Sequence, residues 1–225
     1  MSRRVRRSAA AERAGPILDL YAPCWEGRPL GPHDYVISAD EKTSIQARAR
    51  CHAPAPVAPG HPQRVEHEYR RHGAWAYLAG WDVHQARLFG LCAPRSGIAP
   101  FGRLVAAVMT QEPYRSARRV FWVLDNGSAH RGAVSDARLQ ARWPTLHPVH
   151  TPVHASWLNQ IEIYFSVVQR KVLTPNDFAT LATLEHYLLA FQHRYQAMAQ
   201  PFRWTFTRAD LHRLLANLTE VRPAA

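Results

Sequence analysis

The chain contains almost no lysine. Only Lys42 and Lys171 are lysines among 28 basic residues, so the remainder are arginines. Acidic residues number only 17, which leaves a formal net charge of +11 at pH 7. Such an excess favours a polyanionic partner, most often nucleic acid, and the planar guanidinium suits phosphate because it donates two hydrogen bonds at once. A codon bias toward arginine would give the same composition, so charge alone leaves both explanations open.

Cysteines and long apolar runs are equally scarce. Cys24, Cys51 and Cys92 are far apart and form no CxxC pair, and an odd count is typical of a reducing, cytoplasmic environment. No run approaches the roughly 18 apolar residues of a membrane helix, so we expect no membrane partner. The basic start at residues 1–7 is not followed by an apolar segment, which argues against a signal peptide.

Apolar periodicity predicts an α/β domain with a mixed central sheet and helices on both faces. Expected strands cover 35–40, 74–83, 87–92, 120–124 and 146–149, the second and third forming a hairpin. Expected helices cover 98–110, 135–143, a stretch opening near Ser156, a stretch after Asn176, and 209–218. Residues 1–33 carry four prolines and are predicted to form a basic, mostly irregular arm, with a short helix within 9–21 as an option. A single folded domain, including the C-terminal helices, is predicted over 34–220.

Three acidic residues occupy positions suited to a metal site. Asp40 and Asp125 close the apolar runs at 35–39 and 120–124, and Glu162 lies in the helical pattern that opens near Ser156. Ligands gather at the carboxyl ends of strands in such sheets, so parallel neighbouring strands would place the two aspartates side by side. Converging carboxylates repel, and hard divalent cations relieve that repulsion. Two such ions are a common means of cleaving and rejoining phosphodiesters.

Each acid also has a purely structural explanation. Asp125-Asn126-Gly127 is typical of a turn, and Asp40 could be a solvated strand exit. Glu162 could be favoured by the helix dipole, or could complete a capping box with Asn159.

A zinc site is a further alternative, because His147, His150 and His154 recur at helical spacing. Pro148 and Pro152 prevent a regular helix there, which argues against it.

Several polar residues near the acids are candidates for supporting roles. Lys42 lies on the same side as Asp40 if the strand continues, where it could meet a DNA phosphate or simply be a surface lysine. His130 could touch a phosphate, orient a water molecule or bond within its own loop. The remaining candidates for support or DNA contact are Asn126, His154 and Asn159.

Three blocks of this sequence resemble the catalytic blocks of bacterial insertion-sequence transposases of the mariner superfamily. Asp125 and Glu162 are 37 positions apart (162 − 125), close to the spacing expected in that family. Residues 68–73 and 201–205 add to the likeness, which spans about residues 35–218. The three blocks are Ser-Ala-Asp-Glu-Lys-Thr at 38–43, Val-Leu-Asp-Asn-Gly-Ser-Ala-His at 123–130, and Thr-Pro-Val-His-Ala-Ser-Trp-Leu-Asn-Gln-Ile-Glu at 151–162.

The resemblance implies an RNase H-like fold, the fold shared with retroviral integrases. It implies a DDE triad of Asp40, Asp125 and Glu162 that holds two Mg²⁺ or Mn²⁺ ions. It further implies an endonuclease that cuts element ends and joins the freed 3′ hydroxyls to target DNA, without a covalent enzyme intermediate. The family works on DNA as a homodimer or larger assembly.

The chain departs from this family at its start. Members carry helix-turn-helix modules ahead of the catalytic domain, whereas only about 34 residues precede the first strand here. We therefore expect a fragment, the product of a split reading frame, or a degenerate copy, with the missing modules possible on a separate chain. The alternative function is a truncated, non-catalytic DNA-binding remnant, which would bind DNA without cutting it.

Overall fold

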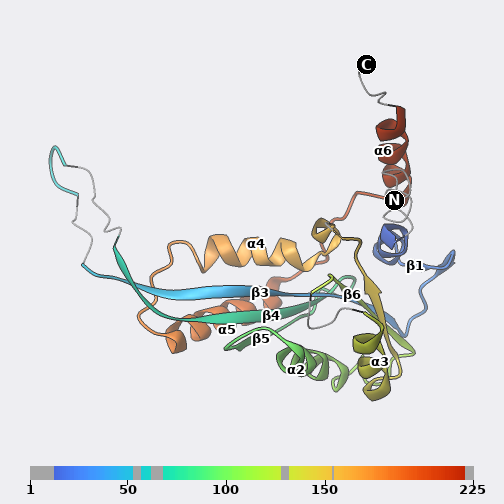
Figure 1. Cartoon of the computed structure of the whole chain (residues 1–225), viewed down its shortest axis with the longest axis horizontal. Helices are drawn as coiled ribbons and strands as arrows, with labels where there is room; N and C mark the ends of the chain where they lie inside the picture. The colour runs from blue at the N-terminus through green and yellow to red at the C-terminus, as the bar shows by residue number, and fades with distance from the viewer. Residues whose placement is uncertain (1–12, 53–56, 62–67, 128–131, 154, 221–225) are drawn as a thin grey trace.

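The centre of the protein is a five-stranded mixed sheet with strand order β5-β4-β3-β6-β7 (Figure 1). The computed structural model describes residues 13–52, 57–61, 68–127, 132–153 and 155–220. β3 runs parallel to β6, which runs parallel to β7, while β4 lies antiparallel to both β3 and β5. The mixed sheet predicted from the sequence is confirmed. The strands are β3 Asp34–Arg50, β4 Tyr69–Asp82, β5 Leu88–Ala93, β6 Arg119–Leu124 and β7 Leu146–His150.

Helices cover both faces of the sheet, as expected. Buried side chains of α2 and α3 form one core layer, and those of α4, α5 and α6 belong to the other. None of the helices in the described ranges is long and apolar enough to span a bilayer. The helices are α2 Ile98–Met109, α3 Ala133–Arg142, α4 Ile161–Lys171, α5 Leu181–Met198 and α6 Arg208–Glu220, with a 3-10 turn η1 at Ser156–Leu158.

Strand β6 shows why the sheet needs two helical layers. Alternate side chains of a strand point to opposite faces. Phe121 and Val123 pack in the layer of α4 and α5, while Val120, Trp122 and Leu124 pack in the layer of α2. All five are completely buried. An apolar run without polar alternation is stable only where both faces are covered.

The N-terminal segment packs onto this core. Residues 13–21 form a helix, and the Tyr21 hydroxyl donates a hydrogen bond of 2.5 Å to the Leu158 carbonyl. A small hairpin follows, made of β1 Cys24–Trp25 and β2 Arg28–Pro29, and Trp25 packs on the Phe121 ring. We expected residues 1–33 to form a mostly irregular arm, but the described part of this segment is folded against the sheet. The domain boundary at residue 34 stays a prediction.

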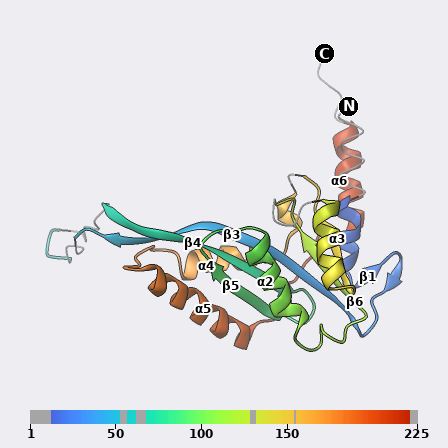
Figure 2. The ribbon, with the colours of Figure 1, turned by 60° about the horizontal axis from the view of Figure 1, so that its bottom comes forward.

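Strand β3 is much longer than its apolar run. We expected it to end at Asp40, but it continues to Arg50 because β4 remains paired with it to Tyr69. Beyond the end of β6 the two strands continue as a long ribbon, and α4 and α5 lie along it (Figures 1 and 2). Asp40 therefore lies within a continuous strand, at the point where its parallel neighbour stops.

Candidate active site at the acidic sheet edge

The parallel pairing of β3 and β6 brings Asp40 and Asp125 to the same edge of the sheet. The last paired residues are Ala39 and Leu124, so the two aspartates are the next residues on neighbouring strands. The backbone leaves the sheet at Asp125, whose Oδ1 accepts a hydrogen bond of 2.7 Å from the Gly127 amide. The turn expected from the Asp-Asn-Gly sequence is therefore present. It does not exclude a functional role for the Asp125 carboxylate.

Asp40 carries a strongly perturbed carboxyl group at this edge. Only 7% of the residue is exposed. Burial raises its pKa to about 7, and the negative charges of Asp125, Glu41 and Glu162 add to the increase, partly offset by a 2.7 Å hydrogen bond from the Glu41 amide. Asp40, Asp125 and Glu162 thus lie close enough for their charges to oppose one another.

The Asn159 side chain holds Asp40 in place through hydrogen bonds. Its Nδ2 donates to the Ala39 carbonyl at 3.0 Å and to Asp40 Oδ2 at 3.2 Å. Its Oδ1 accepts from the Ser38 hydroxyl, whose oxygen in turn accepts from the Ile161 amide at 2.9 Å. Both Ser38 and Asn159 are buried. These bonds fasten the start of α4 to β3 at the level of the aspartate.

Helix α4 supplies Glu162 from its first turn. The helix begins at Ile161 rather than near Ser156, because residues 156–158 form the separate 3-10 turn. Glu162 is exposed, yet the pKa of its carboxyl is raised by partial desolvation and by the charge of Asp125, with Lys42 opposing the increase. The capping box considered for Asn159 and Glu162 is absent, because the Asn159 side chain is committed to β3.

A family model described as a DDE superfamily endonuclease matches residues 35–185, which include all three acids. The chain belongs to this DDE endonuclease family. No curated protein matches the chain closely enough to be informative. Solved structures do match it in fold, although their sequences have diverged widely.

Complexes of the Mos1 mariner transposase are among the matching structures. The Mos1 paired-end complex with Mn superposes with a TM-score of 0.58 at 15% identity, covering 98% of this chain and 62% of that one. A pre-cleavage Mos1 transpososome gives a TM-score of 0.61 at 12% identity, covering 96% and 64%. These likenesses confirm the RNase H-like fold. This DDE endonuclease chain spans less than two thirds of the length of the Mos1 chains it matches.

The chemistry of the acidic edge fits divalent metal ions. Carboxylate oxygens are the protein ligands that Mg²⁺ and Mn²⁺ prefer, and a cation would relieve the repulsion that raises the Asp40 pKa. Within the described ranges, no three His, Cys, Asp or Glu side chains are gathered tightly enough to hold a single ion among themselves. Mg²⁺ generally takes few ligands from the protein and keeps positions for water and phosphate.

The other candidate residues have varied surroundings. Lys42 is half-buried on β3, and its charge acts on Glu162. Asn126 donates from Nδ2 to the Thr151 carbonyl at 2.7 Å and so links the ends of β6 and β7. Asn159 is buried, which suits a positioning role. His130 and His154 lie outside the described residues.

Sequence reasoning missed two contributors to this edge. Ser38 was placed in an apolar run and in the 38–43 block but given no role of its own, although its hydroxyl joins β3 to α4. His150 was considered for zinc, but its Nε2 lies 2.8 Å from Asp136 Oδ1 and its Nδ1 3.4 Å from the Asp125 carbonyl. The position of His150 beside Asp125 follows from the parallel pairing of β7 with β6, which places Leu124 opposite His150.

Proposed function

We propose that the chain is the catalytic domain of a DNA transposase that cuts element ends and joins the freed 3′ hydroxyls to target DNA. The observation that carries this proposal is the placement of three acids in a chain of the DDE endonuclease family. Asp40 and Asp125 follow the last paired residues of two parallel strands, and Glu162 lies in the first turn of α4, which is bonded to β3 at Ser38. Three mutually opposed carboxylates at one sheet edge are costly to maintain unless they serve a positively charged ligand.

Each residue has a definite task in this proposal. Asp40, Asp125 and Glu162 would hold two Mg²⁺ or Mn²⁺ ions, which supply activation of the attacking oxygen and stabilisation of the leaving oxygen when bound. Asn159 fixes the carboxylate of Asp40 through a hydrogen bond to its Oδ2. Phosphoryl transfer of this kind needs positioning and charge neutralisation rather than a covalent intermediate, and these carboxylates are held by rigid elements suited to both.

The partners follow from the same proposal. Terminal repeats and target DNA are the substrates, and the net charge of +11 favours binding to both. The Mos1 relatives were solved as paired-end and strand transfer complexes, which supports assembly as a homodimer or larger complex. Recognition of the repeats would fall to helix-turn-helix modules, which a separate chain could supply.

The decisive experiment is cleavage of labelled DNA that carries the repeats flanking the gene. We expect nicking or strand transfer that requires Mg²⁺ or Mn²⁺ and disappears in Asp125→Asn, because the amide keeps the shape of aspartate but loses the charge that holds metal. Asp177→Asn is the matched control, since Asp177 is half-exposed and paired only at the surface with Arg50. Full activity in Asp125→Asn would rule out the assignment.

The same assay separates the alternatives. Binding without cleavage at any divalent metal concentration would favour the non-catalytic remnant. Cleavage without preference for the repeats would instead indicate a general nuclease of this fold.

A further inference from the structure

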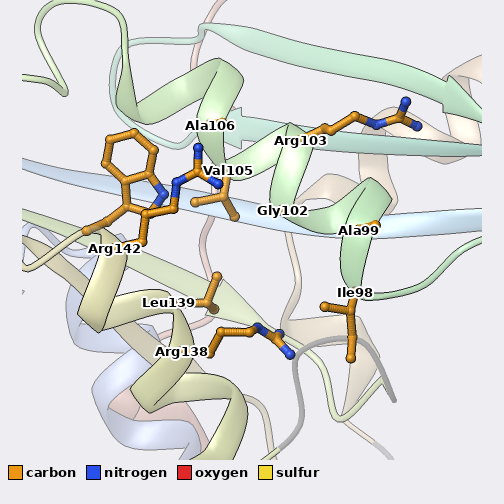
Figure 3. Close-up of a pocket in the computed structure, with 10 residues that line it drawn as sticks. Ile98, Ala99, Gly102, Arg103, Val105, Ala106, Arg138, Leu139 and Arg142 are labelled. Carbon is orange, nitrogen blue, oxygen red and sulfur yellow. The ribbon is translucent and has the colours of Figure 1, made fainter.

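A groove of about 400 Å³ lies between α2 and α3, on the sheet face opposite α4 (Figure 3). Its apolar lining, here called the floor, includes the buried Val105 and Leu139 together with Ile98 and Trp143. Ile98 is 55% exposed, which is high for a large aliphatic side chain at the start of a helix. The volume lies within the usual range of ligand sites, about 300–1,000 Å³.

The rim of the groove is strongly positive. Arg103 comes from α2, Arg138 and Arg142 come from α3, and all three are exposed. None of the ten lining residues is acidic. Arg138 is oriented by a 2.8 Å hydrogen bond to the Ser135 hydroxyl, and the Arg142 guanidinium lies 5.4 Å from the Trp143 ring centre. The Arg103 side chain has no such contact and extends away from α3 (Figure 3). Guanidinium groups beside an apolar floor suit a ligand that has phosphates and a flat ring.

The two helices that line the groove begin at the edge of the sheet that carries the acidic residues. β5 runs in the direction of β3 because both are antiparallel to β4, so β5 and β6 end at the same edge. Helices α2 and α3 follow these two strands and therefore begin there. Asp136 in the first turn of α3 bonds His150, which approaches the Asp125 carbonyl. A strand of DNA at the acidic edge can thus continue into the groove.

We propose that the α2–α3 groove binds a single-stranded segment of DNA, with its phosphates on Arg103, Arg138 and Arg142 and a base over the apolar floor. This inference rests on the proposed function for the nature of the ligand, but it concerns binding and not cleavage.

The apolar floor distinguishes a single strand from a duplex. A duplex presents phosphates and sugars outward while its bases stay stacked inside, so it would use the arginines and leave the floor uncovered. An unpaired strand exposes the faces of its bases, and stacking on aromatic or apolar side chains contributes about 1–3 kcal/mol per base. The combination of Trp143, Leu139 and a basic rim therefore fits the single strand.

The test measures DNA binding by fluorescence anisotropy in EDTA, so that cleavage plays no part. The probes are a labelled 12-nucleotide strand of mixed sequence and the duplex of the same sequence. In the double variant Arg103→Ser/Arg142→Ser we expect about tenfold weaker binding of the single strand. The slope of log affinity against log salt should fall by about 1.4, because two phosphate contacts are lost.

A matched control has the same change of charge away from the groove. Arg115→Ser/Arg194→Ser removes two exposed arginines that do not line it, and this variant should keep most of the single-strand affinity. Circular dichroism melts verify that both variants are folded. Equal losses in the two double variants, or an equal loss for duplex and single strand in Arg103→Ser/Arg142→Ser, would overturn the proposal.

The outcome is independent of catalysis. Asp125→Asn, measured in the same way, should bind the single strand at least as well as the wild type, since it lacks one negative charge. A chain that binds through the groove but never cuts DNA would sustain this inference while refuting the proposed transposase activity. If the chain cuts repeat ends but the groove variants bind the single strand as the wild type does, the transposase activity is supported and the groove inference is refuted.

Discussion

Asn159 donates a hydrogen bond to the carboxylate of Asp40 across 3.2 Å, although 119 positions separate the two residues in the sequence. The same side chain accepts from Ser38 and donates to the Ala39 carbonyl, so it fixes three consecutive residues of β3. The amide therefore determines where one carboxylate oxygen of Asp40 lies relative to the start of α4, the helix that carries Glu162.

Replacing Asn159 by alanine should reduce metal-dependent DNA cleavage by about 10- to 100-fold, the usual cost of losing a residue that orients a metal ligand. Raising the metal concentration should restore part of the rate, because the ligands themselves remain. The measurement is the initial nicking rate across a Mn²⁺ titration.

The control for this variant is Asn176→Ala. Asn176 also bonds a backbone carbonyl, that of Gln46 at 2.8 Å, but it lies in the segment between α4 and α5. The control should lose stability without a change in the metal dependence. A wild-type metal titration in Asn159→Ala would contradict the positioning role.

Asp40 should destabilise the metal-free protein at neutral pH. Its pKa is raised to about 7 from 3.8, so the unfolded chain releases its proton at lower pH than the folded chain does. Stability should therefore decrease as pH rises from about 4 to 7, by an amount on the order of 4 kcal/mol. In EDTA at pH 8 we expect Asp40→Asn to melt at a higher temperature than the wild type, with little difference near pH 4.

The substitution Asp40→Asn should stabilise the protein by less than the ~4 kcal/mol expected from the pKa of Asp40 alone. The asparagine has a single acceptor oxygen, so the hydrogen bonds from Glu41 and Asn159 compete for it, at a cost of about 1 kcal/mol. A lower melting temperature than the wild type at pH 8 in EDTA would show that the carboxylate is not under electrostatic strain.

Asp34 should have the opposite effect on stability. Its side chain is fully buried and bonds Arg118 at 2.6 Å and Arg119 at 2.8 Å. Burial opposes ionisation, but these arginines and the Gly31 amide outweigh it and hold the Asp34 pKa well below its usual value. The stabilisation is therefore present above about pH 4 and is lost as pH falls further.

Replacement of Asp34 by asparagine should cost about 2–3 kcal/mol at pH 7, because two guanidinium groups lose their charged acceptor. Denaturant unfolding at pH 7 and pH 3 checks this prediction: the difference between variant and wild type should shrink at the lower pH. A constant difference at both values would mean that the contribution of Asp34 does not depend on its charge.

The sequence was informative where burial dictates the residue pattern. The unbroken apolar run of β6 predicted a strand covered on both faces, and Phe121 and Trp122 do pack in opposite layers. Strand β5 and the helix α2 were also predicted close to their observed bounds, whereas β4 begins at Tyr69, five residues before its predicted start. In each of these elements the pattern of one short segment is enough to determine its structure.

The sequence was less informative where a distant segment determines local structure. The polar residues from Lys42 onward do not resemble a buried strand, yet β4 pairs with them and extends β3 to Arg50. Ser156 has the side chain of a good N-cap, but α4 starts five residues later, where Asn159 and Ile161 bond Ser38. Ser38 and Asn159 are 121 positions apart, so no local sequence pattern predicts the hydrogen bond between them.

The proposed metal site of Asp40, Asp125 and Glu162 is tested most directly by calorimetric titration of the chain with Mn²⁺. The wild type and Asp177→Asn should bind Mn²⁺ alike, whereas Asp40→Asn, Asp125→Asn and Glu162→Gln should each weaken that binding. Wild-type Mn²⁺ affinity and stoichiometry in any one of these three variants would contradict a single site built from all three carboxylates.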